Sequence, residues 1–253
     1  MITLITPVWN GVKTIAETIE SVRLQQPYCT QYIVLDSDSN DGTSELVKTM
    51  GNVVTHYIRE KDGGLYDAMN KGIQRATGEI IGIINADDTL INGALKRVAE
   101  AFADPMVDFV YSDVEVFDDA GRDLGLFKAR PEWVAGATYW HGRDWRFIVP
   151  LSHPGLFVRR RVYEEIGGFD LKFRLAADHE FIARLIARGR VGRYIPKPLS
   201  RFRVGGLSGS DFSIFTEDEI IAKRYGVPAW LAKLNRYRSI LGRIKQRALK
   251  ISF

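Results

Sequence analysis

Two adjacent carboxylates, Asp87 and Asp88, follow a short apolar run, Ile80–Ile84. A β-branched run of this length is typical of a strand buried on both faces of a parallel sheet. Ligands of open α/β sheets bind beyond the carboxyl ends of such strands. Two acids there repel each other unless a cation or a proton lies between them. The pair therefore indicates a divalent-metal site for a phosphate-bearing ligand; the alternative is that both acids cap the following helix.

Polar residues also follow two other strand-like runs, Ile2–Thr6 and Tyr32–Leu35. The second run leads into an acidic loop, 36–43. Parallel strands bring their carboxyl ends to one edge of a sheet, so we expect these ends to lie beside Asp87. A carboxylate in the loop can accept the N3–H of uracil, although ordinary loop structure would also explain it. The candidate nucleoside-binding residues are Thr6, Asp36 and Asp38. No GxGxxG motif follows the first strand, which disfavours a dinucleotide site.

Apolar spacing predicts the elements that position these residues. The predicted helices are 12–22, 45–50, 66–76 and 93–102, and the predicted third strand is 53–58. This alternation predicts an α/β fold, a mostly parallel sheet with helices on both faces. After the strand 109–116, Asp118–Gly121 predicts a turn between antiparallel strands. The irregular, aromatic-rich segment 131–150 predicts a lid or binding loop.

Asp178 begins an amphipathic helix and is a candidate general base for an attacking hydroxyl group. The alternative is an N-cap residue that the helix dipole favours. Glu180 and Asp170 are lesser candidates for the base. His153 precedes a short strand, and it is either a buried structural histidine or an acceptor-side residue.

Several other side chains could contact a donor. Arg201 and Arg203 alternate along a strand that leads to a glycine-rich loop, and an arginine fork suits a diphosphate. Asp67 and Asn70 share one helix face, and Asn70 could help to position the donor. Arg59 and Lys71 could meet phosphate, although Lys71 could equally be a solvated surface charge. Trp140 and Trp145 could stack on sugar rings, or they could fill the core.

The chain of 253 residues can form one large domain, or one domain with an appendage. No apolar run approaches the roughly 18–20 residues that span a bilayer. The sequence begins directly with a strand-like run, and Cys29 is the single cysteine. We therefore expect a cytoplasmic location, with no secretory signal and no disulfide.

The basic charge is concentrated near the C-terminus. Residues 229–253 contain seven Lys and Arg and no acid, and subtracting these from the net charge of +4 leaves −3. Apolar residues recur there at alternating spacings of four and three: Trp230, Leu234, Tyr237, Leu241, Ile244 and Ala248. This pattern predicts a basic amphipathic helix suited to an anionic membrane surface. The alternative is a helix that packs on the catalytic domain or on a second subunit, so an oligomer is possible.

The motifs together resemble family 2 glycosyltransferases of the GT-A fold. The resemblance extends from Ile2 to about Ser208. The matching segments are Thr6–Asn10, Asp36–Thr43, Gly64–Gly72, Asn85–Asp88, Gly167–Asp170 and Ala177–Glu180. The segment Glu60–Asn70 resembles members that build bacterial surface polysaccharides.

This resemblance implies a catalytic domain, 1–210, with a nucleotide-sugar half (1–117) and an acceptor half (118–210), and a helical extension, 211–253. It implies a nucleotide-diphosphate sugar donor, Mg²⁺ or Mn²⁺, and inversion of the anomeric carbon. The implied roles are Asp178 as base, Asp88 and Asp87 as metal ligands, and a donor site at Thr6, Pro7, Asn10, Asp36, Asp38, Asp67, Asn70 and Asp87. The strand pattern above adds Arg201 to this donor site. Two positions depart from the family pattern: Asn85 replaces an acid of the metal motif, and Ser37 separates Asp36 from Asp38.

The sequence therefore predicts an inverting, metal-dependent glycosyltransferase that moves a sugar from a UDP-sugar to a glycan or lipid-linked acceptor. We expect it to lie in the cytoplasm, either free or peripherally on the inner face of the cell membrane. One rival is a sugar nucleotidyltransferase, which normally carries a basic glycine-rich loop after its first strand. The other is a non-enzymatic basic protein that binds membranes or nucleic acid. Acidic strand ends would repel nucleic-acid phosphates, so no nucleic-acid partner is expected.

Overall fold

The computed structural model describes residues 1–135, 150–205 and 211–248. The predicted roles of Trp140 and Trp145, and most of the predicted binding loop 131–150, lie outside the described residues.

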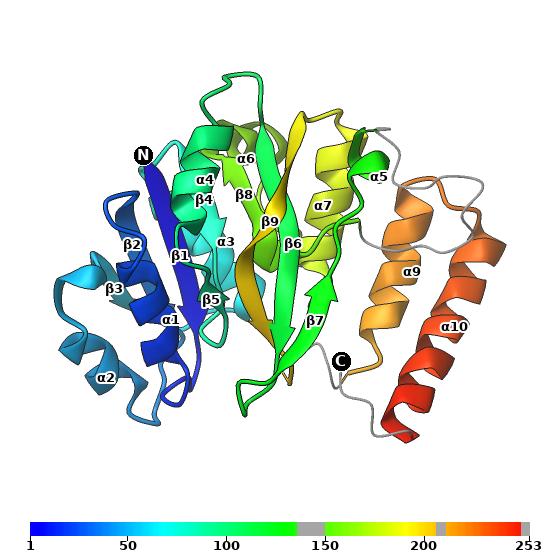
Figure 1. Ribbon diagram of the computed structural model, residues 1–253. Helices are drawn as coiled ribbons and strands as arrows, with labels where there is room; N and C mark the ends of the chain where they lie inside the picture. The colour runs from blue at the N-terminus through cyan, green and yellow to red at the C-terminus, as the bar shows by residue number, and fades with distance from the viewer. Residues whose placement is uncertain (136–149, 206–210, 249–253) are drawn as a thin grey trace.

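The first half of the chain forms the parallel part of a nine-stranded sheet (Figure 1). Its strands β3, β2, β1 and β4 lie side by side in that order. Their bounds are Ile2–Val8 (β1), Cys29–Asp36 (β2), His56–Arg59 (β3) and Ile80–Ile83 (β4). The connecting helices are α1 (Ile15–Arg23), α2 (Thr43–Thr49) and α3 (Leu65–Arg75), with a 3₁₀ turn, η1 (Gly51–Val53), before β3.

The second half continues the sheet with mixed strand directions, in the order β4, β8, β6, β9, β5. The strand β8 is antiparallel to both neighbours, β6 is parallel to β9, and β5 and β7 pair antiparallel with β9 and β6. The bounds are Thr89–Leu90 (β5), Phe109–Phe117 (β6), Asp123–Phe127 (β7), Leu156–Arg159 (β8) and Gly192–Arg203 (β9). The parallel order predicted for the sheet therefore describes its first half.

Helices cover both faces of the sheet, and a hydrophobic core lies under each layer. Adjacent residues of β1 point to opposite faces, as the period of two requires. Leu4 packs in the core that contains Ile15 of α1, and Ile5 packs in the core that contains Met69 of α3. The α/β architecture with helices on both faces is confirmed.

The remaining helices complete these layers and the C-terminal region. They are α4 (Ala94–Ala101), α5 (Pro131–Ala135), the 3₁₀ turn η2 (His153–Gly155), α6 (Arg160–Ile166), α7 (Ala177–Ala187), α9 (Ile214–Arg224) and α10 (Ala229–Ala248). The helix α9 contacts both α7 and α10, so α10 lies at the edge of the molecule (Figure 1). Among the described residues, no helix is both long and apolar enough to cross a membrane.

Two predicted alternatives are wrong because the helices begin elsewhere. The helix after Asp87 and Asp88 begins at Ala94 with Gly93 as its N-cap, and β5 lies between, so neither acid caps it. The N-cap of α7 is Ala176, and Asp178 lies within the first turn.

Gly82 of β4 shows how tightly the centre of the sheet is packed. A Cβ atom at this position would lie 2.6 Å from Phe157 Cδ1 and 3.0 Å from Leu4 Cδ2. We expect Gly82→Ala to lower the free energy of unfolding by about 1–3 kcal/mol, because both neighbours are buried and cannot move freely. Urea denaturation measures the change.

The matched control is Gly242→Ala on α10, where a Cβ atom meets nothing within 4 Å. Alanine there should stabilise the protein by up to about 1 kcal/mol through its higher helix propensity. A Gly82→Ala variant as stable as wild type would contradict this account of the packing.

Candidate active site

The loops after β1 and β2 are held together by hydrogen bonds. The Asn10 backbone N–H donates to Ser39 Oγ at 2.8 Å, and the Asn40 N–H donates to Asn10 Oδ1 at 3.0 Å. The Val12 N–H donates to Asp41 Oδ2 at 3.0 Å. Asn10 adopts a left-handed φ of 52°, a conformation that asparagine tolerates better than most residues. The two strand ends therefore form one rigid edge, as the sequence predicts.

Within this edge, Asp36 and Thr6 face the protein interior. Asp36 is 1% exposed, and its two oxygens accept hydrogen bonds from the Ser39 N–H (2.8 Å) and the Tyr57 hydroxyl (2.5 Å). The Thr6 hydroxyl pairs with the buried Tyr32 hydroxyl at 3.0 Å. In this structure both side chains form hydrogen bonds inside the protein that support the loops. Pro7 is buried beside them.

Asp38 is the exposed acid of this loop. Its carboxylate accepts a hydrogen bond from Arg59 Nε at 3.0 Å, while Arg59 Nη2 donates to the Ser39 carbonyl at 2.9 Å. Arg59, a candidate phosphate contact, therefore braces the loop. Lys71 similarly donates to the Lys61 carbonyl (2.9 Å) and pairs with Asp67 (3.2 Å).

Asp88 is fully buried in the connection between β4 and β5, beside the end of β9. Its Oδ1 accepts the Arg203 backbone N–H at 3.0 Å, and its Oδ2 accepts Asn85 Nδ2 at 3.1 Å. Burial first, and then the charge of Asp87, raise the pKa of Asp88 well above its usual range. The side chain thus joins the two halves of the sheet beside the strand ends.

Asp87 and Asn85 offer oxygen atoms that suit a hard divalent cation. Asp87 is half-buried, and burial raises the pKa of its carboxyl group. A nearby cation would lower this pKa again. The buried Asn85 Oδ1 has no hydrogen-bond partner among the described residues. No three His, Cys, Asp or Glu side chains in the described ranges cluster as metal ligands. These residues fit a cation that takes its remaining ligands from a bound phosphate and water.

Arg203 encloses the same place from β9. Its Nε donates to the Asp87 carbonyl at 3.1 Å, and its Nη2 pairs with Glu17 of α1 at 2.5 Å. Arg201 lies on the same face of the strand, because both guanidinium groups stack on the Phe117 ring, at 4.4 and 4.5 Å. Arg201 is the more exposed of the two and lies 3.4 Å from Glu115.

The candidate base, Asp178, is half-buried at the start of α7. Its Oδ1 accepts a hydrogen bond from the Tyr66 hydroxyl at 2.7 Å, which also lies 3.1 Å from the Leu175 carbonyl. Tyr66 is buried in the first turn of α3, so one hydrogen bond fixes Asp178 relative to the nucleotide half. Tyr66 belongs to the Gly64–Gly72 motif, but its sequence position alone predicts no role for its hydroxyl group.

Two acids of α9 support the region around Asp178: Glu217 holds the loop before it, and Asp218 holds His179 after it. Neither acid was predicted from the sequence. Glu217 accepts three backbone N–H groups, those of Arg174 (2.9 Å), Leu175 (2.9 Å) and Ala176 (2.8 Å). Asp218 Oδ1 lies 2.7 Å from His179 Nδ1. Acids at the start of a helix are common, so no local sequence signal could have revealed these long-range contacts.

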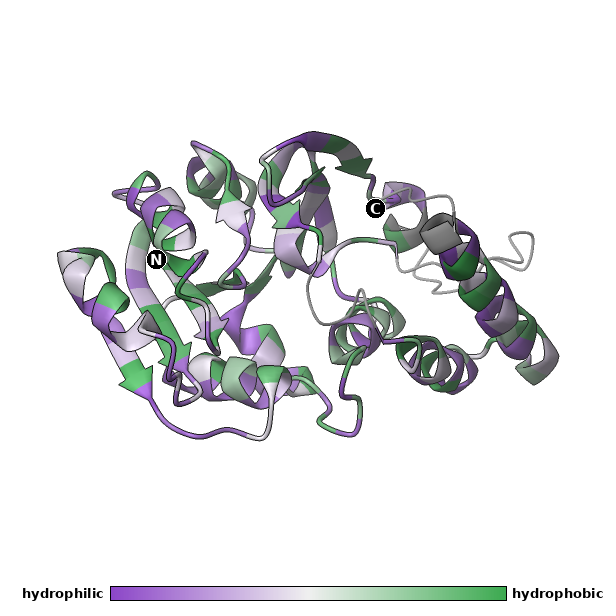
Figure 2. Cartoon of the chain, turned by 90° about the horizontal axis from the view of Figure 1, so that it is seen from below, coloured by the Kyte–Doolittle hydropathy of each residue, from purple (hydrophilic) through white to green (hydrophobic). Residues whose placement is uncertain are grey.

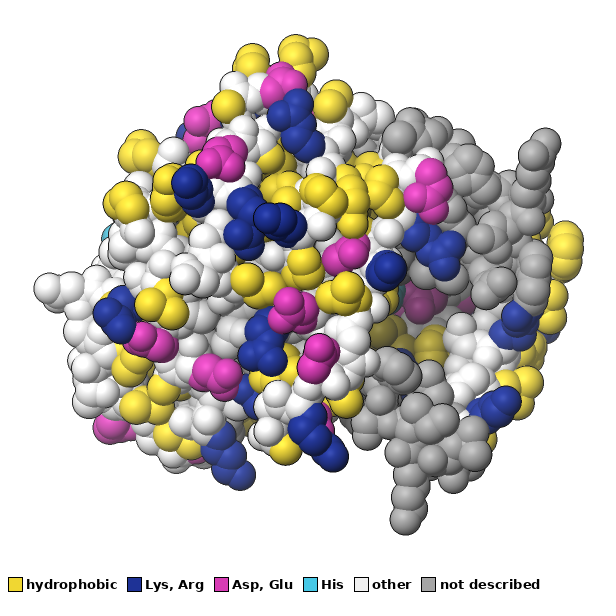
Figure 3. Space-filling model, in the orientation of Figure 1, with side chains coloured by type: hydrophobic (Ala, Val, Ile, Leu, Met, Phe, Trp, Pro, Cys, Tyr) yellow, Lys and Arg dark blue, Asp and Glu magenta, His cyan; other side chains and the backbone are white. Residues whose placement is uncertain are grey.

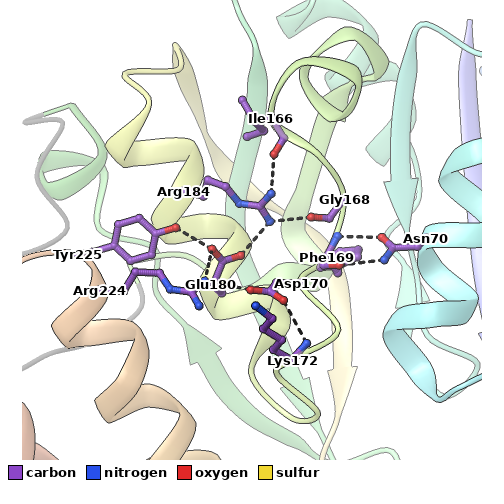
Figure 4. A network of polar contacts seen from close by, with 10 residues as sticks. All are labelled: Asn70, Ile166, Gly168, Phe169, Asp170, Lys172, Glu180, Arg184, Arg224 and Tyr225. Atoms are coloured by element: carbon purple, nitrogen blue, oxygen red, sulfur yellow. Dashed lines mark hydrogen bonds and ion pairs between the residues drawn. The ribbon is translucent and has the colours of Figure 1, made fainter.

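A polar network connects this region to α3 (Figure 4). Asn70 forms two hydrogen bonds with the Phe169 backbone, accepting its N–H at 2.8 Å and donating to its carbonyl at 2.9 Å. Glu180 is buried and accepts hydrogen bonds from Arg184 (2.8 Å) and Tyr225 (2.7 Å). Asn70 therefore joins α3 to the loop that contains Phe169, and Glu180 joins α7 to the end of α9.

Two other candidates also have structural partners. Asp67 accepts the Gly63 N–H at 2.8 Å, and this bond is the main cause of its lowered pKa. His153 is buried, and its ring lies edge-on to Phe169 with centroids 5.6 Å apart. Burial lowers the pKa of His153. The structural interpretation of His153 therefore has direct support.

Comparison with known proteins now assigns the family. A family model described as "Glycosyl transferase family 2" matches residues 3–167, so the chain belongs to glycosyltransferase family 2. A "PGL/p-HBAD biosynthesis glycosyltransferase" of Mycobacterium bovis is 25% identical over 253 residues, covering 96% of this chain and 93% of the relative. An "Uncharacterized glycosyltransferase" of Mycobacterium tuberculosis is 29% identical, covering 72% of this chain and 68% of its own. The predicted transferase class is confirmed, and it displaces the nucleotidyltransferase and non-enzymatic rivals.

Solved structures confirm the GT-A type fold. Staphylococcus aureus TarS 1–349 in complex with UDP-GlcNAc superposes with a TM-score of 0.67 at 19% identity, covering 99% of this chain and 76% of that one. The mannosyltransferase PcManGT from Pyrobaculum calidifontis, in complex with GDP-Man and Mn²⁺, gives 0.63 at 22% identity, with coverage of 93% and 68%.

The contribution of the His179–Asp218 pair to the free energy of unfolding should depend on pH. Burial alone would lower the pKa of His179, but the carboxylates of Asp218, Asp178 and Glu217 outweigh it and raise the pKa to about 9. An unfolded histidine has a pKa of about 6.5. The stabilisation is therefore complete below about pH 6.5 and is lost as the pH rises through about 9. Asp218→Asn should lower the free energy of unfolding by about 1–3 kcal/mol at pH 6 and by much less at pH 10.

Urea denaturation at both pH values measures this difference. Glu164→Gln is the control, because it removes only an exposed ion pair with Arg160 and should change the free energy by less than about 0.5 kcal/mol. An equal effect of Asp218→Asn at both pH values would rule out a protonated His179 as the source of stability.

Proposed function

We propose that this chain is an inverting, metal-dependent glycosyltransferase that uses a nucleotide-diphosphate sugar, with a UDP-sugar as the favoured donor. The carrying observation is that the chain provides both an oxygen-lined strand end, at Asn85 and Asp87, and a half-buried carboxylate, Asp178, which the Tyr66 hydroxyl holds. The surface-polysaccharide role is part of this proposal, with a glycan or lipid-linked acceptor. The division into 1–210 and 211–253 also stays a prediction.

The donor side of the proposal rests on the joined loops after β1 and β2. Asp38 is exposed there, and Asn10 lies beside it at the end of β1. The base and ribose would lie against this edge, with the diphosphate directed toward Asp87. Arg201 lies two residues before Arg203 on β9 and is partly exposed. It is the remaining candidate for a phosphate contact.

For the metal, we favour Asp87 over Asp88. Asp88 is 0% exposed and both its oxygens accept protein hydrogen bonds, whereas Asp87 is half-buried. Mg²⁺ or Mn²⁺, when bound, would neutralise the charge of the leaving diphosphate. Asp88 would act by positioning Asn85 and Arg203.

The acceptor side rests on Asp178. Its carboxylate would take the proton of the acceptor hydroxyl while that oxygen bonds to the anomeric carbon and the bond to the diphosphate breaks. Attack opposite the leaving group inverts the anomeric carbon. The Tyr66 hydrogen bond, at 2.7 Å, directs one carboxylate oxygen and leaves the other available to the acceptor.

The relatives support the donor and acceptor classes. The two structural neighbours were solved with UDP-GlcNAc and with GDP-Man plus Mn²⁺, so both ligands are nucleotide-diphosphate sugars. The mycobacterial relative is named for the biosynthesis of PGL and p-HBAD. The ligands of the two solved structures support a nucleotide-sugar donor directly. The name of the mycobacterial relative gives less direct support for any particular acceptor.

Asp87→Asn tests the metal ligand. With UDP and Mn²⁺ at about 100 times their Kd, wild type should melt about 5–10 °C higher than without ligand. Asp87→Asn should lose most of this shift, because an amide binds a divalent cation more weakly than a carboxylate. Thermal unfolding followed by fluorescence measures the shift.

Asp88→Asn is the comparison variant. Its amide oxygen can still accept the Arg203 N–H, and Asp88 offers no exposed oxygen to a cation, so this variant should lose less of the shift than Asp87→Asn. A full shift in Asp87→Asn, with loss confined to Asp88→Asn, would reverse the assignment. No shift in wild type with UDP, GDP or other nucleoside diphosphates would count against the proposed donor class.

Asp178→Asn tests the base. Transfer should fall by roughly 10²- to 10⁴-fold, the usual contribution of a positioned base, while the nucleotide-dependent melting shift persists. Asp170→Asn is the control, since this nearby carboxylate pairs with Arg224 at 3.0 Å and should leave transfer within a few-fold of wild type. Product formation from a screen of donors and acceptors, followed by mass spectrometry, supplies the rate. Near-normal transfer by Asp178→Asn would refute its role.

A further inference from the structure

The helix α10 has two faces in different environments. Leu231, Ala232 and Asn235 are buried, and the two apolar residues form a small core with Ala222 and Val227. Arg236 adds an ion pair with Glu219 of α9, at 3.3 Å. The helix is therefore fixed to α9 by this face, which contains none of the apolar residues that the sequence pattern singled out.

The opposite face is apolar and exposed. Its five large side chains are Trp230 (70% exposed), Leu234 (44%), Tyr237 (48%), Leu241 (65%) and Ile244 (50%). At about 100° per residue they occupy an arc of about 80°, directed away from the buried face. We call these five residues the outer stripe. Figure 2 shows α10 at the edge of the molecule in alternating hydrophobic and hydrophilic bands.

Cations border the outer stripe on both sides. Lys233 lies on one side and Lys245 lies on the other, and both are exposed. Residues 229–253 contain no acid, and Glu219 of α9, which acts on Lys233, already pairs with Lys223 and Arg236. At the right-hand edge of Figure 3, where α10 lies, hydrophobic and basic side chains occur together on the surface.

This combination selects one occupant. The spacing of four and three residues would also suit a second helix in a coiled coil. A second copy of α10, however, would bring its own cations against these cations, without an acid to pair them. An anionic lipid surface satisfies both features, since the apolar stripe enters the acyl boundary and the flanking cations meet lipid phosphates.

We propose that the outer stripe of α10 binds the interface of an anionic phospholipid bilayer and holds the protein on the membrane surface. The proposal is independent of the donor and metal assignments above. It has a structural consequence for the site, because α9 lies between α10 and α7 and carries Glu217, which holds the loop before Asp178. The membrane would therefore lie beside the acceptor side of the protein.

Flotation of the full chain with vesicles tests this proposal. The protein should float with vesicles of phosphatidylcholine and phosphatidylglycerol at low salt, and much less with phosphatidylcholine alone. Raising the salt to about 0.5 M should weaken flotation, because the charge attraction is screened. The double variant Trp230→Ser/Leu241→Ser should bind at least about tenfold more weakly. In wild type both side chains bury apolar surface in the bilayer, and serine cannot replace that contribution.

Two control variants separate the contributions. Met106→Ser/Leu126→Ser removes two exposed apolar side chains outside α10, 68% and 47% exposed, and should float like wild type. Lys233→Gln/Lys245→Gln should retain the fold and reduce the preference for phosphatidylglycerol. Circular dichroism melting and the nucleotide-dependent shift check that each variant is folded, independently of lipid.

Three outcomes would overturn the proposal. The first is the absence of flotation with anionic vesicles, and the second is equal flotation of wild type and Trp230→Ser/Leu241→Ser. The third is a dimer, seen by light scattering without lipid, that the same double variant dissociates. That result would assign the outer stripe to a second copy of the chain.

Discussion

The candidate site depends on a single buried carboxylate at the junction of the two halves of the sheet. Asp88 has no exposed surface, yet it accepts hydrogen bonds from the Arg203 backbone and from Asn85. Thr18 of α1 adds a bond to the Asp88 carbonyl at 2.8 Å. A buried acid is costly unless such donors surround it, so its partners are constrained in turn. Because these bonds fix Asp88 in the interior, the adjacent Asp87 lies half-buried at the strand end, where solvent can reach it.

The acceptor side is supported from a different direction. Asp178 is held by Tyr66 from α3, and the loop before it is held by Glu217 from α9. The network around Glu180 and Arg184 then ties α7 to the Phe169 loop and to the end of α9 (Figure 4). Three segments distant in the sequence therefore converge on one carboxylate. This arrangement makes α9 part of the scaffold of the site, although the sequence placed it in a separate extension.

The sequence predicted the elements better than the roles of individual side chains. The alternation of strands and helices through Phe102 is reproduced, because buried β-branched runs and amphipathic helices leave periodic signals. The prediction placed the start of β3 at residue 53, but Gly51–Val53 forms a 3₁₀ turn and the strand begins at His56. The two-residue strand β5 is too short to leave any periodicity, and its pairing with β9 depends on residues about 110 positions away.

Several side chains contact protein groups where the sequence motifs suggested a ligand, and the reason is the same in each case. Asn70 carries a family motif, but its amide closes two hydrogen bonds with Phe169, 99 residues away. Asp36 was a base-reading candidate, and its oxygens are taken by Ser39 and Tyr57. Motif position identifies which residues lie near a site. It does not reveal whether a given polar atom faces the ligand or satisfies a buried backbone group.

The sequence alone is enough to predict the family, the α/β class, the convergence of polar strand ends and the amphipathic character of the last helix. These features are local or periodic, so a linear sequence records them. Other features depend on the fold: Asp88 is fully buried while Asp87 is half-buried, Glu217 and Asp218 bond residues on either side of Asp178, and Trp230 and Leu241 face outward. Each of these depends on which distant segment covers a side chain, and burial of that kind is a property of the packed chain alone.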